Sequence, residues 1–373
     1  MSENKILYID NLKVLMTVLV ILHHAFITYG APGDWYYVQK TSQIGALIPM
    51  TIFVATNQSF FMGFFFFLSA LFTGPSYDRK GAGKFIGDRL LRFGIPLLFY
   101  SLILSPVMNF LVAKYGHGKT YSFVQFLGGY HPWISFGVLW FVVALLLFTL
   151  VYALLRKLRG DRPPKAYPVP SGRTIFFFAL SLGLVSFLVR LVFPVGWTLS
   201  PIGFQLGHFP QYIALFALGI VASRHQWLQQ VEVIDGKKWG TAALLLVLVA
   251  MPVMYVLKTI TNSPPEAFRG GLNWQSLLYS LWEQFTGLSI ILALLSRSRR
   301  IWNEQSHLLK NMSRSAFAAY IFHPLFLIGI SLLMRDLALD PAIKLLMAAP
   351  TAVVATFLFA GLLVKVPGVN KIV

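Results

Sequence analysis

The chain contains no cysteine among its 373 residues. This absence excludes disulfide bonds, a cysteine nucleophile, iron–sulfur clusters and zinc sites built from thiolates. Charged residues are also scarce, at 12% of the chain, whereas a typical soluble domain has about 25%. Hydrophobic residues make up 57%, and the mean hydropathy is +0.68. The composition therefore predicts an integral membrane protein, with the lipid bilayer as its surroundings.

Acidic residues are few, with 13 Asp and Glu against 31 Lys and Arg, which gives a net charge of +18. A basic excess of this size can indicate nucleic-acid binding. Here the basic residues lie in short loops between apolar segments, which is the pattern that sets membrane topology. We therefore predict no nucleic-acid partner.

Apolar segments long enough to cross a bilayer recur ten times. They are residues 8–29, 44–72, 91–112, 136–155, 174–193, 208–223, 240–257, 273–296, 315–333 and 342–364. The sequence predicts an all-α polytopic integral membrane protein with ten transmembrane helices, in which residues 1–373 form a single transmembrane domain. The irregular second segment is expected to tilt strongly or to combine a short re-entrant piece with a span.

Basic residues are concentrated in alternate loops. One set of loops contains 73–90, the Pro-rich connector 156–173, 224–239 and 297–314, and the other set has few Lys and Arg. Because basic loops stay in the cytoplasm, we predict that both termini are cytoplasmic and that the protein is a multi-pass protein of the cell membrane. The loops of the other set, for example 33–40 and 128–133, are aromatic and are predicted to anchor the helices at the interface; a sugar-stacking platform is the alternative.

The first apolar segment, residues 8–30, carries Asp10, Lys13, His23 and His24. A charge inside a spanning helix is costly, so it usually faces a bundle interior or a wet cavity and marks a functional site. Lys13 and His24 share one helix face, roughly 16 Å apart along the axis. His23 points about 100° away from that face. This arrangement suits a long substrate with an anionic end and a reactive end.

Two arginines follow the next basic loop, in GDRLLRFGIP at 87–96. Arg89 and Arg92 are three residues apart, so they lie on one side of the third helix near its cytoplasmic end. Together with Lys13 they could clamp phosphate groups in a bidentate manner. The alternative is ordinary anchoring to lipid headgroups.

Two further titratable residues lie within apolar segments. Glu283 needs a partner, and we consider equally an internal salt bridge, for instance with Arg190, and a role in orienting or charging an imidazole. His323 precedes Pro324, and an isolated histidine on an apolar helix is often structural. His208 begins a segment and is predicted to lie at the membrane interface.

Metal and serine chemistry have little support in the sequence. His24 is a candidate metal ligand, proton relay or general base, but a metal site needs three or four convergent ligands and no HxxxH or HExxH spacing occurs. No GxSxG motif is present either, so Ser69 is expected to pack rather than to attack. We predict no metal site.

Five short motifs occur in order along the chain. They are a basic residue followed eleven positions later by histidine (Lys13 and His24), FFFLSAL, RxxR before a proline (Arg89, Arg92 and Pro96), LWFVVALL at 139–146, and SAFAAYIFHP with His323. Over essentially its whole length the chain resembles the membrane acyltransferase-3 family, in particular the glucan succinyltransferase-like branch. It departs from the family at Lys13, where arginine is usual, and at Ala70, where glycine is usual.

The resemblance implies O-acyl transfer across the membrane, with no permanently bound cofactor. The donor substrate is expected to be cytoplasmic acyl-CoA, either acetyl-CoA or succinyl-CoA. The expected acceptor is a hydroxyl group of a cell-surface or exported carbohydrate or of a small acceptor. Lys13, Arg89 and Arg92 are the expected coenzyme A ligands. His24, Glu283 and His323 are the catalytic candidates, with His24 as general base or acyl carrier.

Two other functions are compatible with the sequence. Intramembrane His, Glu and Arg also form the proton relays of proton-coupled transporters. A non-catalytic membrane scaffold could retain the same fold. The absence of a visible inverted repeat counts against common transporter architectures. The sequence carries no signal for an oligomeric state.

Overall fold

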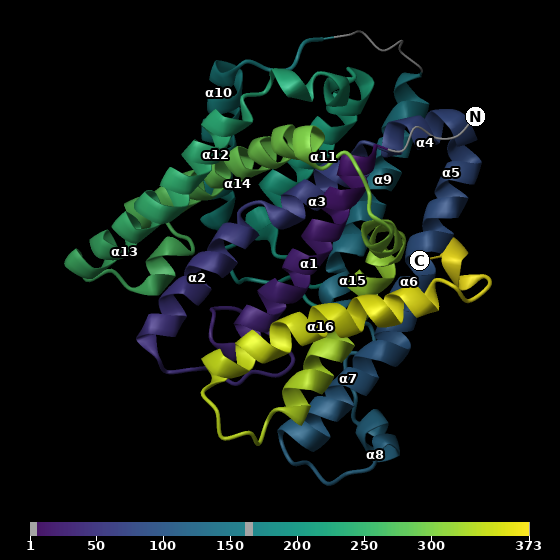
Figure 1. The fold of residues 1–373 in the computed structure, drawn as a ribbon, viewed down its shortest axis with the longest axis vertical. Helices are drawn as coiled ribbons and strands as arrows, with labels where there is room; N and C mark the ends of the chain where they lie inside the picture. The colour runs from purple at the N-terminus through teal and green to yellow at the C-terminus, as the bar shows by residue number, and fades with distance from the viewer. Residues whose placement is uncertain (1–5, 161–166, 373) are drawn as a thin grey trace.

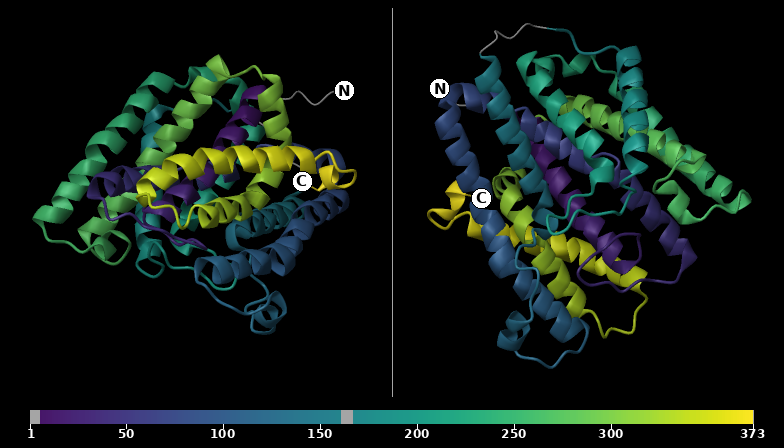
Figure 2. Two further views of the ribbon diagram at one scale, coloured as in Figure 1. Left: turned by 60° about the horizontal axis from the view of Figure 1, so that its bottom comes forward. Right: turned by 180° about the vertical axis from the view of Figure 1, so that it is seen from behind.

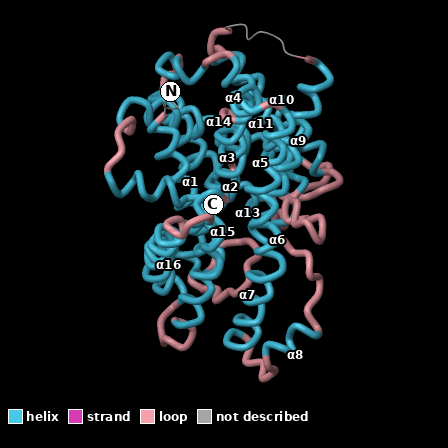
Figure 3. The backbone as a smooth tube through the Cα atoms, turned by 90° about the vertical axis from the view of Figure 1, so that its right-hand side faces the viewer, coloured by secondary structure: helices cyan, strands magenta, loops and turns pink. Residues whose placement is uncertain are grey.

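The computed structural model describes residues 6–160 and 167–372, and part of the predicted connector, 161–166, lies outside them. Within these ranges the chain forms helices and loops with no β-strand (Figure 3). Ten helical stretches are long and apolar enough to cross a membrane. The predicted all-α polytopic fold with ten spans is therefore confirmed.

Among the described residues, five spans are single helices, four of them long and the fifth the shorter α10, and the other five spans are built from shorter pieces. The long helices are α1 (Leu7–Tyr29), α14 (Trp274–Ile301), α15 (His307–Leu333) and α16 (Pro341–Leu363). The first half of the chain adds α2 (Ile44–Gln58), α3 (Phe61–Ala70), α4 (Thr73–Lys80), α5 (Ala82–Arg89), η1 (Leu90–Gly94), α6 (Ile95–Phe99), η2 (Tyr100–Leu104), α7 (Ser105–Leu111), η3 (Val112–Gly116), α8 (Phe123–Gly128), η4 (Gly137–Leu139) and α9 (Trp140–Arg159). The second half adds α10 (Gly172–Arg190), η5 (Leu206–His208), α11 (Phe209–Arg224), η6 (Trp227–Gln229), η7 (Val231–Val233), α12 (Gly236–Leu245), η8 (Leu246–Ala250), α13 (Met251–Ile260), η9 (Pro265–Phe268) and η10 (Val369–Lys371).

The second span is interrupted where α2 ends and α3 begins. A helix break leaves backbone carbonyl groups without partners, which is tolerated at membrane depth only against protein or a cavity. Here the Gln211 side chain of α11 donates a hydrogen bond to the carbonyl of Ser59, at 2.7 Å. Gly287 of α14 allows this approach, because a Cβ there would lie 2.0 Å from the same oxygen.

The third span alternates α-helical and π-helical turns. The π-helical segment η1 contains Arg92, and Pro96 follows it in α6. Proline lacks the N–H group that closes an α-helical turn, and wider turns are one way a helix accommodates it. The predicted 91–112 span is thus part of a longer helical stretch, residues 82–116.

Helix α1 lies in the middle of the bundle (Figure 1). Helices α10, α12 and α14 group together on one side of it, and α15, α16 and α7 on the other (Figures 1 and 2). The side chains of Tyr8, Leu12 and Met16 are fully buried in the core. Helix α1 contacts α2, α3, α14, α15 and α16. Its polar residues therefore face other helices on several sides.

Candidate active site

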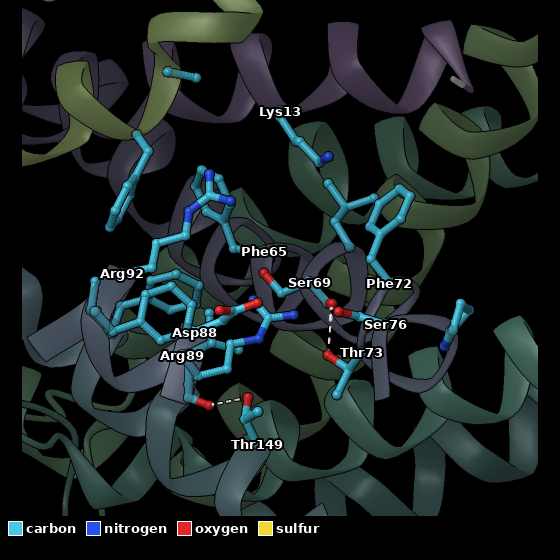
Figure 4. Close-up of a pocket in the computed structure, with 18 of the residues that line it drawn as sticks. Lys13, Phe65, Ser69, Phe72, Thr73, Ser76, Asp88, Arg89, Arg92 and Thr149 are labelled. Carbon is cyan, nitrogen blue, oxygen red and sulfur yellow. Dashed lines mark hydrogen bonds between the residues drawn. The ribbon is translucent and has the colours of Figure 1, made fainter. Parts of the chain in front are cut away.

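A cavity of about 740 Å³ lies where α1 begins, between α1 and the segments α3, α4, α5, η1, α9 and α15 (Figure 4). Five basic and two acidic side chains line it: Lys13, Arg79, Lys80, Arg89, Arg92, Asp10 and Asp88. The cations outnumber the acids by three, so the cavity favours an anionic ligand. Its volume is within the usual range for small-molecule sites.

The three residues predicted to bind phosphate all enter this cavity. Lys13 comes from α1, Arg89 from the end of α5 and Arg92 from η1 (Figure 4). The ammonium group of Lys13 lies 3.1 Å from Asp10 Oδ1 and 4.4 Å from the centre of the Phe72 ring. The structure thus brings together one lysine and two arginines that the sequence separates by more than 70 positions.

Aromatic rings support Arg89 within the wall. Its guanidinium carbon lies 5.2 Å from the centre of the Phe85 ring and 5.5 Å from that of Phe93. Guanidinium groups stack well on aromatic faces, and stacking leaves the edge N–H groups available for oxygen acceptors. Arg89 is therefore held in one orientation while its donors remain accessible to a ligand.

His24 and His323 form a direct pair between α1 and α15. His24 Nδ1 lies 3.1 Å from His323 Nε2, and the two rings are nearly parallel, with centres 5.2 Å apart. His323 Nδ1 lies 2.7 Å from the backbone carbonyl oxygen of Tyr320. These two contacts connect the histidine of the first motif with the histidine of the last one.

Pro324 explains why the carbonyl of Tyr320 is available. In an α-helix this oxygen would accept a hydrogen bond from the N–H of residue 324, and proline has none. His323 Nδ1 takes the place of that missing donor. The His-Pro sequence therefore acts as a unit, in which proline frees a carbonyl and the preceding histidine binds it.

The hydrogen bonds assign the tautomers of both rings. A carbonyl oxygen only accepts, so the proton of neutral His323 is on Nδ1, and its Nε2 carries a lone pair. That lone pair accepts from His24, which places the His24 proton on Nδ1. His24 Nε2 is then unprotonated and is able to act as a base.

His23 points to a different part of the bundle, as its position in the sequence predicts. Its Nδ1 lies 3.2 Å from Asn57 Nδ2, and its ring stacks on Phe61 with centres 4.8 Å apart. The rings of His23 and His24 are nearly perpendicular. The two adjacent histidines therefore serve separate environments, one beside α2 and α3 and the other beside α15.

Trp35 lies against the other face of His24. Its ring is 4.1 Å from the His24 ring between centres and inclined by 21°. The sequence analysis predicts an interfacial anchor in this loop, and the structure adds that the Trp35 ring packs against the histidine pair. No local signal in the loop sequence distinguishes Trp35 from the adjacent tyrosines, so the sequence analysis missed this contact.

We expect Trp35→Ala to lower the rate of any reaction that uses His24 by about three- to tenfold. An aromatic stack contributes about 0.5–1.5 kcal/mol beyond area burial, and the imidazole loses that restraint. Trp35→Phe is the matched control. It retains a stacking ring, and the Trp35 N–H has no hydrogen-bond partner within the described ranges, so the change loses no bond there. Steady-state turnover of both variants checks this, and equal losses in the two would contradict it.

Part of the cavity wall is aromatic and is linked to the histidine pair through Tyr320. Phe65, Phe141 and Tyr320 line it, with ring centres 5.6 to 6.4 Å apart. The hydroxyl group of Tyr320 donates to the carbonyl oxygen of Val138, and its own carbonyl binds His323. Tyr320 is thus part of the cavity wall and also part of the histidine chain.

Glu283 lies in a separate buried cluster of α10, η5 and α14. Arg190 donates to its Oε2, His208 Nδ1 lies 3.1 Å from its Oε1, and Gln284 donates to Oε2 at 3.0 Å. The structure therefore shows the salt bridge with Arg190 that the sequence left open. It shows no contact between Glu283 and His24 within the described residues.

The buried cluster also corrects the prediction for His208. Its side chain is 3% exposed and contacts the Glu283 carboxylate, so the expected place at the membrane interface is wrong. Arg190 is fully buried and also donates to the carbonyl of Gly207 and to the hydroxyl of Ser280. The cluster therefore surrounds the buried charge pair with hydrogen bonds to Arg190 and to Glu283 Oε2.

Ser69, Arg79 and Lys80 also line the cavity, although the sequence analysis assigned them no functional part. Arg79 and Lys80 belong to a loop interpreted as cytoplasmic, and nothing in that sequence sets them apart from its other basic residues. Their place in the cavity wall is visible only in the folded structure. Among residues 6–160 and 167–372, no group of three or more His, Cys, Asp or Glu side chains is placed to hold a metal ion.

The described residues thus form a ten-span helical bundle in which Tyr320 links a cationic cavity to a pair of imidazoles. A family described as "Acyltransferase domain" matches residues 6–365. The chain belongs to this acyltransferase family, and it is a multi-pass membrane acyltransferase.

The similar curated proteins carry one name. The chain is 23% identical to glucans biosynthesis protein C of Shigella dysenteriae serotype 1 (strain Sd197) over 333 residues, which cover 86% of this chain and 82% of that protein. It is 22% identical to glucans biosynthesis protein C of Escherichia coli (strain K12), with the same coverage. No solved structure matches the chain.

Proposed function

We propose that the protein transfers a short acyl group, acetyl or succinyl, from cytoplasmic acyl-CoA to a hydroxyl group of a carbohydrate at the cell surface. The observation that carries this proposal is the chain from Pro324 through Tyr320 and His323 to His24, in which Tyr320 also lines the cationic cavity. The name of the similar proteins, which refers to glucans, supports a carbohydrate acceptor.

The cavity supplies binding for the donor. Lys13, Arg89 and Arg92 would hold the phosphate groups of coenzyme A, since guanidinium groups bind phosphate oxygens in pairs and an ammonium group acts as a point charge. The positions of Lys13 and His24 on α1 differ by about 16 Å along the helix axis. An extended pantetheine arm would carry the thioester over that distance, past Phe65 and Tyr320.

His24 Nε2 would take the proton of the acceptor hydroxyl group while the hydroxyl oxygen attacks the thioester carbonyl carbon. The tetrahedral intermediate then collapses, the C–S bond breaks, and the sulfur leaves with the proton that His24 returns. His323 would hold the His24 ring and share the positive charge that develops on it. If the acyl group is instead carried by the enzyme, the same lone pair of Nε2 is the nucleophile.

Membership of an acyltransferase family favours this chemistry over the transporter and scaffold alternatives. The direct test is the loss of thioester from short acyl-CoAs added to purified protein in nanodiscs, together with thermal stabilisation by coenzyme A. We expect both signals from the wild-type protein. Substrate flux without covalent change, or no binding of any short acyl-CoA, would overturn the proposal.

The phosphate ligands give a separate expected result. Replacing Lys13, Arg89 or Arg92 singly with alanine should weaken coenzyme A binding by about tenfold or more, because each removes a charge-assisted contact of about 1.5–3 kcal/mol. Isothermal titration in nanodiscs measures the dissociation constant. Lys84→Ala is the matched control, since Lys84 is an exposed residue of α5 outside the cavity lining. An unchanged affinity in all three variants would rule out the clamp.

A further inference from the structure

We infer that Arg79 and Lys80 form a second anion subsite in the same cavity, which binds the 3′-phosphate of coenzyme A. This inference rests on the proposed use of acyl-CoA and adds to it a specific recognition step. The subsite is distinct from Lys13, Arg89 and Arg92, which would bind the diphosphate.

The turn between α4 and α5 builds the subsite. Helix α4 ends with Arg79 and Lys80, and Gly81 follows with a φ of +72°, a conformation that glycine adopts without strain. The chain then reverses into α5, so that Lys80 Nζ lies 2.6 Å from Asp88 Oδ2. The turn thereby brings α5 beside the end of α4, and Arg79 and Lys80 line the same cavity as Arg89.

The charges in the cavity match a ligand with two separate phosphate groups. Lys13 is paired with Asp10, and Lys80 is paired with Asp88. A diphosphate linkage carries about two negative charges, and a terminal phosphate monoester carries about −1.5 to −2 at neutral pH. Of the five basic side chains in the cavity, Lys13, Arg89 and Arg92 would bind the diphosphate, and Arg79 and Lys80 would bind the phosphate monoester.

Asp88 makes the second subsite selective. Asp88 Oδ2 lies 2.6 Å from Lys80 Nζ, and the carboxylate repels an approaching anion. A ligand must therefore share or replace the contact of Asp88 with Lys80. A phosphate monoester, with three acceptor oxygens and nearly two charges, competes better than a singly charged group. Ligands that lack the 3′-phosphate gain nothing from Lys80 and leave its pair with Asp88 in place.

The test compares the dissociation constants of coenzyme A and 3′-dephospho-coenzyme A, in nanodiscs of neutral lipid. Wild-type protein should bind coenzyme A about tenfold or more tightly than the dephosphorylated form, as expected for one charge-assisted phosphate contact. In Arg79→Ala and Lys80→Ala this ratio should fall towards one, while the affinity for 3′-dephospho-coenzyme A stays unchanged. Arg79→Ala leaves the pair of Lys80 and Asp88 intact, so it reports on binding even if Lys80→Ala disturbs the turn.

Lys84→Ala is again the matched control, because it removes the same charge from α5 outside the cavity and should preserve the ratio. A wild-type protein that binds both ligands equally well overturns the inference and leaves the proposed function intact. A wild-type protein that binds neither overturns the proposed function itself. If the ratio persists in both variants and both variants bind anionic lipid more weakly than the wild-type protein does, Arg79 and Lys80 would be assigned to lipid headgroups instead.

Discussion

Replacing His24 with alanine is expected to lower acyl-CoA turnover by about 10²- to 10⁴-fold while leaving coenzyme A affinity unchanged. The variant removes His24 Nε2, the unprotonated nitrogen of the pair that is not already accepting the hydrogen bond between the two rings. The cations that bind the donor lie on other residues, so binding and chemistry should separate. Thioester hydrolysis assays and titration of coenzyme A measure the two effects independently.

His23→Gln is the matched control for this experiment. It removes an imidazole from the adjacent position and can retain a hydrogen bond with Asn57. Its turnover should remain within a fewfold of wild type. A loss in His23→Gln as large as that in His24→Ala would contradict the assignment of the base, and so would a His24→Ala variant with normal turnover.

Pro324→Ala tests the same chain from its far end. Alanine restores an N–H group four residues after Tyr320, and this donor competes with His323 for the carbonyl oxygen. We expect turnover to fall by about five- to tenfold, the equivalent of one neutral hydrogen bond, with no loss of thermal stability. Unchanged turnover would mean that the contact with Tyr320 does not orient the pair.

Glu283→Gln is expected to destabilise the folded protein strongly, by about 3–5 kcal/mol, because it leaves the fully buried Arg190 without its counter-charge. Thermal unfolding in detergent and the yield of folded protein should both fall. The turnover of each folded molecule should stay near wild type, since the structure shows no contact between Glu283 and His24 within the described residues.

The double variant Arg190→Met with Glu283→Leu provides the control. It replaces both charges with apolar groups and should recover part of the stability that the single change loses. Normal stability of Glu283→Gln combined with a large loss of turnover would contradict this account. That result would instead support the alternative from the sequence, in which Glu283 orients or charges an imidazole.

Residues close together on one helix were predictable from sequence. The relation of Lys13 to His24, and the separation of His23 from them, follow from helix periodicity alone. The contact of Glu283 with Arg190 was one of two interpretations left open. A buried carboxylate needs a partner, but the positions of the residues in the sequence do not identify which one it is. His208 was misplaced because a histidine beside a helix start usually has access to water.

Contacts that depend on a turn or a helix crossing were not predictable. Trp35 stacks on His24 only because the loop after α1 folds back against the bundle. Arg79 and Lys80 share a cavity with Asp88 and Arg89 only because the chain reverses at Gly81 and brings α5 beside α4. In each case the deciding feature is a tertiary approach that residue type and spacing do not encode.

The sequence by itself determined the membrane class, the ten helical spans and the residues of α1 that share a face, because hydropathy and helix periodicity act locally along the chain. Only the tertiary structure decided that His24 meets His323 and that one cavity collects five cations from α1, α4, α5 and η1. The physical reason is that hydrogen bonds and charge pairs act over a few ångströms, so residues 299 positions apart interact only after the helices have packed.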